Sequence, residues 1–428
     1  SPPDQRESPV SIADVLAAID HSILYRAALF YFGFYPIFMA IVWVVMSLAY
    51  FRRRETGQSE LALDDYTPFV SVIIPAYAEE KTIARTLEAL LRVDYPDYEI
   101  IVVTDGSPDG TAAIVKRYFQ SGRVRLLEKR VNEGKAMALN DALPVCRGEI
   151  LVVVDSDIVA TPQLLRALSK HFIAPRVGAV TGNPRVENRS TLLRQLQAIE
   201  FSSIVSVQRR AQRVWGRVLT VSGAVMALRR SAIIEVGLFS PDMATEDIEI
   251  TWRLQRRFWD VRYEPTAVVW MQVPPNLVQL WKQRRRWARG LAQVLRKHID
   301  IPLHWTLRRL WPIYFEAIFS IGWAFTFAFV TLYWLVAISI GYTPYGASPF
   351  PNLWGMIIAS ACLIQLFTGV MMDRRYDPNM LESFPVAILY PLIYWSLMST
   401  ITTIYTIGAF VRRGPRLQTW QIKREPAR

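Results

Sequence analysis

Apolar residues in this chain of 428 residues are concentrated in long uncharged blocks. No charged residue occurs in Ala27–Phe51, in Ala317–Met372 or in Ser383–Val411. Each block contains a run long enough to cross about 30 Å of hydrocarbon as a helix. A buried core helix of that length without one charge is the less favoured alternative. The pattern therefore predicts a membrane span in the first block and three more near Ala317–Ile340, Leu353–Met372 and Ser383–Val411.

From Phe69 onward, apolar β-branched runs alternate with helical stretches. Near-continuous apolar strands separated by helices are typical of βαβ units and of a mostly parallel sheet covered on both faces. In such α/β sheets, ligands bind beyond the carboxyl ends of the strands. The expected strands are Val70–Ile74, Ile100–Thr104, Val124–Leu127 and Ile150–Val154, and the expected helices are Thr82–Arg92, Thr111–Gln120 and Lys135–Val145.

A basic stretch rich in tryptophan, Leu277–Leu310, lies between the sheet region and the second apolar block. Its tryptophans, Trp281, Trp287 and Trp305, are interleaved with arginines. This pattern is typical of an amphipathic helix that lies along a membrane surface. We therefore expect the chain to meet the lipid bilayer here before it crosses again.

Charge supports the same arrangement. The chain is 52% hydrophobic and carries a net charge of +12, but its arginines crowd near the borders of the apolar blocks, at Arg52–Arg54, Arg374–Arg375 and Arg412–Arg413. The positive-inside rule and anionic lipid headgroups favour these positions. No zinc-finger spacing or aromatic RNA-binding box accompanies them, so we expect no binding to nucleic acid. Cys146 and Cys362 lie far apart, which argues against a disulfide framework and fits a reducing cytoplasm.

The expected organisation follows from these blocks. The Arg52–Arg54 cluster places the end of the first span in the cytoplasm and the N-terminus outside. Four full spans would then leave the basic tail outside. Either the last segment, which contains Pro385 and Pro391, is re-entrant, or a span is missing at the N-terminus, which would not correct the count. The expected units are an extracytoplasmic segment (1–26), a transmembrane helix (27–51), a cytoplasmic domain (66–275), interface helices (276–311), a membrane region of about three spans (312–411) and a basic tail (412–428).

Polar side chains follow the first two expected strands. The first strand runs into Pro75, Tyr77 and Glu79, and the second ends at Asp105. A carboxylate at a strand end, followed by a turn into a helix, suits hydrogen bonding to a nucleotide base or ribose. An acidic helix N-cap is an equally good interpretation of each motif alone. Lys135 opens the next helix, where it could reach a phosphate or a base, although an exposed loop lysine is as plausible locally.

Two further acidic motifs indicate group-transfer chemistry. Asp155 and Asp157 follow a buried strand, and hard carboxylate ligands suit Mg²⁺ or Mn²⁺ bridging to a diphosphate. The alternative is a pair of helix-capping acids before Pro162. Glu246 and Asp247 head an amphipathic helix, where Asp247 could accept a proton from an attacking hydroxyl. The alternative there is an acid pair that complements the helix dipole.

The most specific motif is Gln283-Arg284-Arg285-Arg286-Trp287. At helical spacing, Gln283, Arg286 and Trp287 share a face. Arginine can neutralise a diphosphate, and tryptophan can stack on a sugar ring. An ordinary interfacial helix could carry the same five residues, so the order of all the motifs along the chain is the stronger evidence.

That order resembles the family-two processive glycosyltransferases, which include cellulose, chitin and hyaluronan synthases. The resemblance covers about Phe69 to Leu295 and implies a glycosyltransferase A-type domain inserted between transmembrane helices. It also implies inverting transfer with Asp247 as base and Glu246 beside it. The remaining motif residues would bind the donor or acceptor: Asp105 and Lys135 at the uridine, Asp155 and Asp157 at the ribose, diphosphate and metal, and Gln283, Arg286 and Trp287 over donor and acceptor.

A closer resemblance lies in the middle of the chain. Arg176–Arg185, Val221–Ala224 and Met243–Ile248 are similar to the bacterial poly-β-1,6-N-acetylglucosamine synthases, as are Tyr263–Pro265 and Leu280–Arg284. The resemblance implies the donor UDP-N-acetylglucosamine, a growing β-1,6-linked biofilm exopolysaccharide that contacts Thr181 and Asn183, and the bacterial inner membrane with the catalytic domain in the cytoplasm. It further implies a small two-span partner subunit and cyclic di-GMP at the interface between the two subunits.

One departure and several alternatives remain. The family usually has Asn where this chain has Ala78, which removes one expected hydrogen bond to the donor. Another processive synthase (hyaluronan, chitin or cellulose type), a single-transfer enzyme acting on a lipid phosphate and a non-catalytic membrane scaffold are the competing hypotheses. A single-transfer enzyme is not expected to carry the Gln283-x-x-Arg286-Trp287 element, and a scaffold has no reason to keep three carboxylate motifs in register.

Overall fold

A computed structural model of the chain describes residues 11–56, 66–347, 353–411 and 417–420. The first ten residues of the expected N-terminal segment, residues 348–352 of the expected membrane region and most of the expected basic tail lie outside the described residues.

The centre of the molecule is one eight-stranded sheet, in the order β3-β2-β1-β4-β7-β6-β8-β5. The four strands predicted from the sequence are present, and they pair in parallel. β7 is antiparallel to both of its neighbours, β4 and β6, while β6 and β8 pair in parallel. The predicted mostly parallel α/β sheet is confirmed. The strands are β1 (Val70–Ala76), β2 (Tyr98–Asp105), β3 (Val124–Lys129), β4 (Ile150–Val154), β5 (Val159–Ala160), β6 (Val177–Val186), β7 (Val225–Arg229) and β8 (Asp260–Met271).

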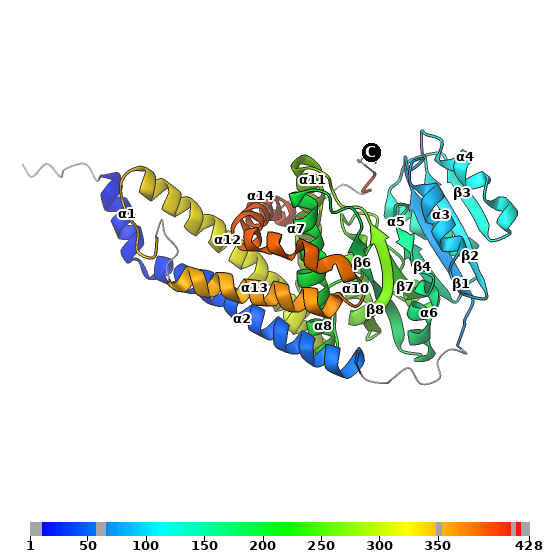
Figure 1. Cartoon of the computed structure of the whole chain (residues 1–428), viewed down its shortest axis with the longest axis horizontal. Coiled ribbons are helices and arrows are strands. Elements are labelled where there is room, and N and C mark those ends of the chain that lie inside the picture. Colours follow the sequence, from blue (N-terminus) through cyan, green and yellow to red (C-terminus); the bar gives the residue numbers. More distant parts are fainter. Residues whose placement is uncertain (1–10, 57–65, 348–352, 412–416, 421–428) are drawn as a thin grey trace, which may run out of the picture.

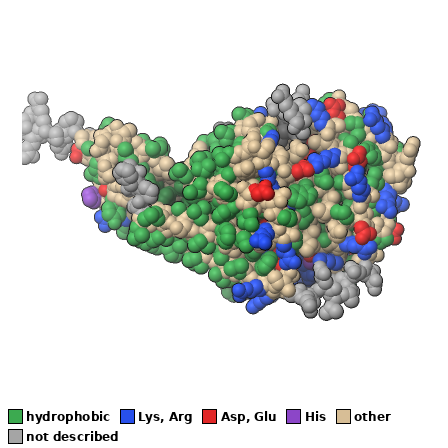
Figure 2. All heavy atoms as spheres, viewed as in Figure 1, with side chains coloured by type: hydrophobic (Ala, Val, Ile, Leu, Met, Phe, Trp, Pro, Cys, Tyr) green, Lys and Arg blue, Asp and Glu red, His purple; other side chains and the backbone are tan. Residues whose placement is uncertain are grey.

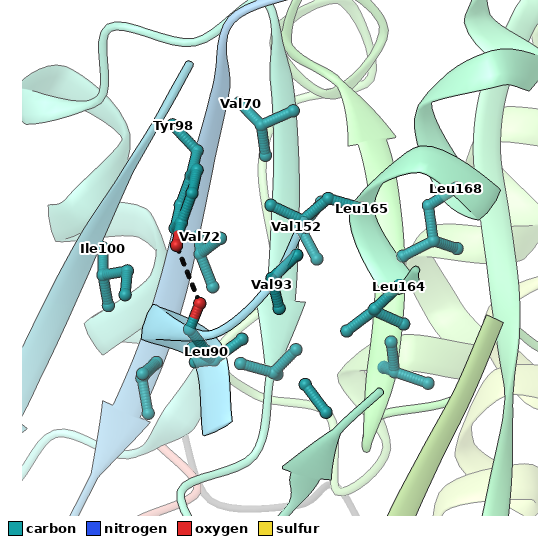
Figure 3. Packing of buried hydrophobic residues seen from close by; sticks show 14 of the residues in the cluster. Val70, Val72, Leu90, Val93, Tyr98, Ile100, Val152, Leu164, Leu165 and Leu168 are labelled. Carbon is teal, nitrogen blue, oxygen red and sulfur yellow. Dashed lines mark hydrogen bonds between the residues drawn. The ribbon is translucent and has the colours of Figure 1, made fainter. Parts of the chain in front are cut away.

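Helices cover both faces of this sheet, because its central strands are apolar on both sides. Val70 and Val72 of β1 face one core, and Ile73 faces the other. On the first face, Tyr98 packs beside Val70 and Val72 and donates its hydroxyl to the carbonyl of Leu90 at 2.8 Å (Figure 3). The covering elements are α3 (Ile83–Leu91), α4 (Thr111–Lys116), η1 (Phe119–Ser121), α5 (Lys135–Ala142), η2 (Leu143–Val145), α6 (Leu164–Ser169), η3 (Lys170–Ile173), α9 (Arg230–Glu235) and α10 (Glu246–Arg256).

Two helical segments join the sheet to the membrane helices. The first is continuous from α7 (Leu192–Glu200) through a π-helical turn, η4 (Phe201–Val205), into α8 (Ser206–Val214). The second is α11 (Leu277–Lys297), followed by the 3₁₀ turns η5 (Ile301–Leu303) and η6 (Trp305–Leu310). The predicted basic amphipathic stretch is thus one helix that ends at Lys297, followed by two short turns.

Within the described part of the chain, four helical segments are long and apolar enough to cross a membrane. The helices α2, α12 and α13 extend together away from the sheet (Figure 1). Hydrophobic side chains cover their surface on the face shown in Figure 2, whereas charged side chains gather over the sheet domain. The elements of this region are α1 (Ile12–His21), α2 (Ile23–Arg54), α12 (Trp311–Ser339), α13 (Leu353–Asp373), η7 (Pro378–Leu389), η8 (Tyr390–Tyr394) and α14 (Trp395–Val411).

Buried ion pairs fasten this helical region to the sheet domain. Asp373, at the end of α13, pairs with Arg185 of β6 and with Arg210 of α8, whose Nη1 lies 2.8 Å from Asp373 Oδ1. Arg210 Nε also lies 2.6 Å from Oε1 of Glu55, just after α2. Removing one partner from such a buried network leaves an uncompensated charge, which costs about 3–5 kcal/mol. The ends of α2 and α13 are therefore held firmly against the sheet domain.

The last apolar segment does not behave like the other three. Asp373 precedes it at the sheet domain, and the backbone amide of Gln418 beyond it donates to the carbonyl of Pro241 in the same domain at 2.9 Å. The six residue steps from Val411 to Leu417 reach at most about 21 Å, less than a hydrocarbon core. Trp281 of α11 also donates its indole N–H to the hydroxyl of Tyr405 at 3.1 Å. The residues on both sides of the segment 378–411 therefore contact the sheet domain.

Candidate active site

A cavity of about 2240 Å³ begins beyond the carboxyl ends of β1 and β4 and continues between the membrane helices. At the sheet end it is lined by acidic residues, including Asp155 and Asp247. At the far end it is lined by Trp43 of α2, Trp323 of α12 and Trp395 of α14. One space thus joins the predicted chemistry to the interior of the helical region.

Lys135 is the cationic centre of the acidic end. Its Nζ lies 2.7 Å from Asp155 Oδ1, 3.0 Å from the carbonyl oxygen of Gly223 and 3.5 Å from Glu246 Oε1. Burial alone would lower the pKa of Lys135, but the Asp155 and Glu246 carboxylates outweigh it and raise that pKa well above its usual range. Lys135 therefore stays charged and ties the end of β4 to the start of α10.

Asp247 lies in the first turn of α10, and its carboxylate faces the cavity. The backbone amide of Gly223 donates to Oδ2 at 3.0 Å, and that of Ile248 donates to Oδ1 at 2.9 Å. Burial, followed by repulsion from Glu246, raises the pKa of Asp247 to about 6, although Lys135 and Arg286 pull it down. A carboxyl group with this pKa is ionised near neutral pH and still basic enough to accept a proton from a hydroxyl.

Helix α11 closes the cavity on the opposite side. Gln283, Arg286 and Trp287 all line it, as their helical spacing predicts. Arg286 Nη1 donates to the carbonyl of Ala244 at 3.2 Å, next to the acidic motif of α10. Helix α11 can pack this close to the start of α10 only because residue 290 is glycine. A Cβ built at Gly290 would stand 2.2 Å from Thr245 Oγ1. The structure thus brings the last two sequence motifs together.

The first motif contributes a different wall. Glu79 lines the cavity, and its Oε2 accepts the hydroxyl of Thr82 at 2.7 Å. Tyr77 is half-buried and stacks on Trp420, with ring centroids 6.4 Å apart and planes 9° from parallel. Trp420 itself lines the cavity, and its backbone exchanges two hydrogen bonds with the Asn132 side chain, at 3.2 and 3.4 Å. Gln418, Thr419 and Trp420 therefore complete the wall at the sheet end of the cavity.

Comparison with known proteins decides the class of this site. Residues 67–290, more than half of the chain, match the family model described as "Glycosyltransferase like family 2". The chain belongs to glycosyltransferase family 2. Poly-β-1,6-N-acetyl-D-glucosamine synthase of Staphylococcus epidermidis is 32% identical over 395 residues, covering 90% of this chain and 96% of the relative. The synthase of the same name from Staphylococcus aureus strain COL is 31% identical over 400 residues, with the same coverage.

A solved structure shows the same fold. It is a mannosyltransferase from Pyrobaculum calidifontis in complex with GDP-Man and Mn²⁺, with a TM-score of 0.58 and 24% sequence identity. The match covers 90% of this chain and 98% of that chain. The prediction of a glycosyltransferase built on an A-type sheet with apolar helices is confirmed by these comparisons and by the sheet topology.

The side chains of this glycosyltransferase provide only some of the ligands that a divalent cation needs. Asp155 and Asp157 both line the cavity and offer carboxylate oxygens, the ligands that Mg²⁺ and Mn²⁺ prefer. Within the described residues, no group of three or more His, Cys, Asp or Glu side chains could hold a metal ion. A cation here would therefore take its remaining ligands from substrate oxygens and water, as Mg²⁺ commonly does.

Asp105 of the glycosyltransferase, expected at the uridine, does not line the cavity in this structure. It is fully buried, and its carboxylate accepts the backbone amides of Glu133 at 3.1 Å and Gly134 at 2.6 Å. Lys129 Nζ lies 3.1 Å from its Oδ1. Asp105 therefore shapes the turn that presents Lys135. Pro75, also expected at the nucleotide, is buried within β1 opposite Val103.

Thr181 and Asn183, expected to touch the acceptor or product, do not line the cavity either. Both are buried in β6 behind the cavity wall. Thr181 Oγ1 accepts the backbone amide of Ser222 at 2.8 Å. Asn183 donates to the carbonyl of Pro265 at 2.8 Å and accepts from Arg185 at 2.8 Å. The Thr181 hydrogen bond braces the loop that contains Gly223, and the Asn183 bond to Pro265 joins β6 to β8.

Sequence reasoning missed three contributors. Gly223 holds both Lys135 and Asp247, and its place in the Val221–Ala224 match was the available signal. Lys129 pairs with Asp105, but a lysine at a strand end gives no local signal. Trp420 lies far from every motif, and only the return of the chain to the sheet domain brings it to Tyr77.

Proposed function

We propose that this glycosyltransferase is a processive synthase that polymerises N-acetylglucosamine from UDP-N-acetylglucosamine into a β-1,6-linked polysaccharide. The observation that carries the proposal is the continuous cavity, which runs from Asp247 into the space between α2, α12 and α14. An enzyme that transfers one sugar to a lipid phosphate does not need a path for a growing chain between these helices. The names of the staphylococcal relatives support the sugar and the linkage.

The proposed chemical step is an inverting displacement. The 6-hydroxyl oxygen of the acceptor sugar attacks C1 of the donor, a new C1–O bond forms, and the bond from C1 to the diphosphate breaks. Asp247 takes the hydroxyl proton, and UDP leaves as the anion. Its raised pKa suits that task, because the ideal catalytic base titrates close to the working pH. Glu246 supports this basicity by repelling the Asp247 charge.

The proposed donor site lies at the sheet end of the cavity. Glu79 and Lys135 line the space for the nucleotide, with the stacked Tyr77 and Trp420 at its edge. We propose that Asp155 and Asp157 hold Mg²⁺ or Mn²⁺ there; when bound, the cation stabilises the leaving diphosphate by charge. Lys135 adds a fixed positive charge beside Asp155, which favours the same negative diphosphate.

The proposed acceptor site lies where α11 lines the cavity. Gln283 offers an amide, and its Oε1 has no hydrogen-bond partner among the described residues. Trp287 offers a ring on which a sugar can stack, and Arg286 offers a cation close to the acidic motif of α10. From there the growing chain would pass along Trp43, Trp323 and Trp395 and leave between the membrane helices.

We propose that the enzyme resides in the bacterial inner membrane with residues 66–275 and the α11 region in the cytoplasm. Arginines at the sheet-domain ends of α2 and α13, Arg52–Arg54 and Arg374–Arg375, support this orientation. With three full crossings and a re-entrant segment, the basic tail returns to the cytoplasmic side. A small two-span partner subunit, with cyclic di-GMP at the interface, remains a proposal that rests on the family resemblance alone.

Purified enzyme in lipid, incubated with individual UDP-sugars and Mg²⁺, tests the proposal. We expect a polymer from UDP-N-acetylglucosamine that a β-1,6-specific hydrolase digests. A polymer from UDP-glucose or UDP-glucuronate would contradict the sugar assignment but keep the class. Transfer of a single sugar per acceptor would contradict processive synthesis. The same reactions with and without the two-span subunit of a relative, and with and without cyclic di-GMP, test the proposed partners.

A further inference from the structure

A guanidinium group covers one face of the Trp287 indole. Cζ of Arg284 lies 3.9 Å from the Trp287 ring centroid. The two residues are one helical turn apart on α11, a spacing that lets their side chains meet. Phe201 of η4 stands edge-on to the same ring, with centroids 6.5 Å apart and planes 80° from parallel. The indole is therefore held from two sides, and Trp287 still lines the cavity, where a ligand can reach it.

Arg284 is itself fixed by two other segments. It is 1% exposed, and its Nη2 bonds to Glu200 at the end of α7 and to the Tyr394 hydroxyl at 3.2 Å. The Tyr394 hydroxyl also donates to Glu200 Oε2 at 2.8 Å. Nε and Nη1 of Arg284 have no hydrogen-bond partner among the described residues. The charge of Arg284 is therefore neutralised by Glu200, and its guanidinium plane serves as a platform below Trp287.

Two π-helical turns meet at this cluster. η4 begins at Phe201, directly after Glu200, and η8 ends at Tyr394 in the segment 378–411. π-Helical turns are rare and occur frequently at functional sites, because the extra residue per turn redirects side chains. Here the two turns aim Phe201 at Trp287 and Tyr394 at Glu200 and Arg284. Three segments separated by up to 194 positions thus converge on one indole.

We propose that Arg284 is a positioning residue that acts through Trp287. With Glu200 and Tyr394, it sets the tilt of the indole on which the acceptor sugar stacks, and it links that tilt to the segment 378–411, which lines the path of the product. The inference rests on the proposed polymerase function. In this arrangement the charge of Arg284 is matched by Glu200, so we assign it no role at the diphosphate.

The expected effect falls on the acceptor and not on the donor. A cation over an aromatic face contributes about 0.5–2 kcal/mol. Its loss should raise the KM for a short β-1,6-linked N-acetylglucosamine acceptor by roughly threefold to thirtyfold. The affinity for UDP-N-acetylglucosamine should change by less than about twofold, since no donor contact is removed. Weaker retention of the acceptor should also shorten the polymer.

The experiment compares two variants. Arg284→Met keeps a long side chain but loses the positive charge, whereas Arg284→Lys keeps the positive charge. We expect Arg284→Lys to recover part of the acceptor KM and of the polymer length. Tyr394→Phe should show a smaller change of the same kind. Arg213→Met is the matched control: Arg213 of α8 also pairs with a carboxylate, Asp260, at 2.9 Å, but it does not line the cavity.

A double-mutant cycle shows whether Arg284 acts through Trp287. In a Trp287→Phe background, Arg284→Met should raise the acceptor KM by less than half of its effect on the native enzyme. Additive effects would overturn the proposal, and so would equal losses of acceptor and donor affinity in Arg284→Met. If native enzyme makes no polymer at all, the proposed function fails first; a native polymer with unchanged Arg284→Met kinetics overturns only this inference.

Discussion

The backbone amide of Gly223 donates to Oδ2 of Asp247 at 3.0 Å, while the Gly223 carbonyl accepts Lys135 Nζ at 3.0 Å. One glycine therefore holds both a carboxylate and a cation of the site. A Cβ at this position would lie 3.1 Å from the carboxylate oxygen and 3.3 Å from the ammonium nitrogen. The residue must be small for the base and the lysine to approach each other across the loop.

Asp247→Asn should remove the base and keep the site. The amide has nearly the same shape as the carboxylate but cannot accept the hydroxyl proton, and general bases contribute about 10²–10⁴-fold to a rate. We expect kcat to fall within that range, with binding of UDP-N-acetylglucosamine retained. Initial rates and isothermal titration with the donor provide the two measurements. An unchanged rate would exclude Asp247 as the base.

The rate should depend on pH through Asp247. Its pKa is raised from the usual value to about 6, mainly by burial and then by Glu246. Since the base works only when ionised, the rate should fall as the pH drops through about 6. Glu246→Gln should move this limb to lower pH, because it removes the repulsive charge. Profiles of kcat between pH 5 and 8 for native enzyme and Glu246→Gln measure the two effects. If the fall in rate occurs at the same pH in both, the Glu246 charge does not raise the pKa of Asp247.

The metal requirement should reside in the acidic pair after β4. Chelation should abolish transfer, and Mg²⁺ or Mn²⁺ should restore it. Asp157→Asn should raise the cation concentration needed for half-maximal rate at least several-fold, because one hard anionic ligand is lost. Glu80→Gln, which removes a carboxylate from another part of the cavity wall, is the control. An identical cation requirement in Asp157→Asn and native enzyme would remove Asp157 from the metal site.

Gly290→Ala should inactivate the enzyme although alanine is the better helix former. The added Cβ would stand 2.2 Å from Oγ1 and 2.4 Å from Cγ2 of Thr245, the residue before Glu246 and Asp247. α11 and α10 must then move apart, and a displacement of about 1 Å at a reacting group can cost about 10²-fold in rate. Thr245→Ala in the same chain removes the two nearest clashing atoms, leaving only Cβ at 2.8 Å, and should recover part of the rate. Gly408→Ala, where nothing lies within 4 Å, is the control.

Trp420→Ala should weaken binding of the donor. Trp420 stacks on Tyr77 at the nucleotide end of the cavity, and such aromatic pairs contribute about 0.5–1.5 kcal/mol. We expect the KM for UDP-N-acetylglucosamine to rise about two- to tenfold, with the acceptor KM unchanged. Leu417→Ala, at an exposed position in the same segment, should have no effect. Equal changes in both variants would argue against a specific role for the indole.

Much of the architecture could be predicted from local sequence, for physical reasons. An uncharged run such as Ala27–Phe51 can only be stable in hydrocarbon or in a core, and its length selects the membrane. Apolar runs such as Ile150–Val154, separated by helical stretches, suit a sheet buried on both faces. Because parallel strands end at the same edge, Asp155 and the turn before Lys135 were bound to meet there, and helical spacing alone put Gln283, Arg286 and Trp287 on one face.

The remaining decisions depended on contacts between distant parts of the chain, which no local pattern encodes. A strand-end aspartate looks the same whether it faces a ligand or a turn, so only packing against Gly134 and Lys129 turned Asp105 inward. Thr181 and Asn183 lie behind the wall because β6 pairs with β7 and β8. The length and apolarity of 378–411 suit a membrane. Where its two ends lie was decided by tertiary contacts, because the residues before and after it, Asp373 and Gln418, both bind the sheet domain.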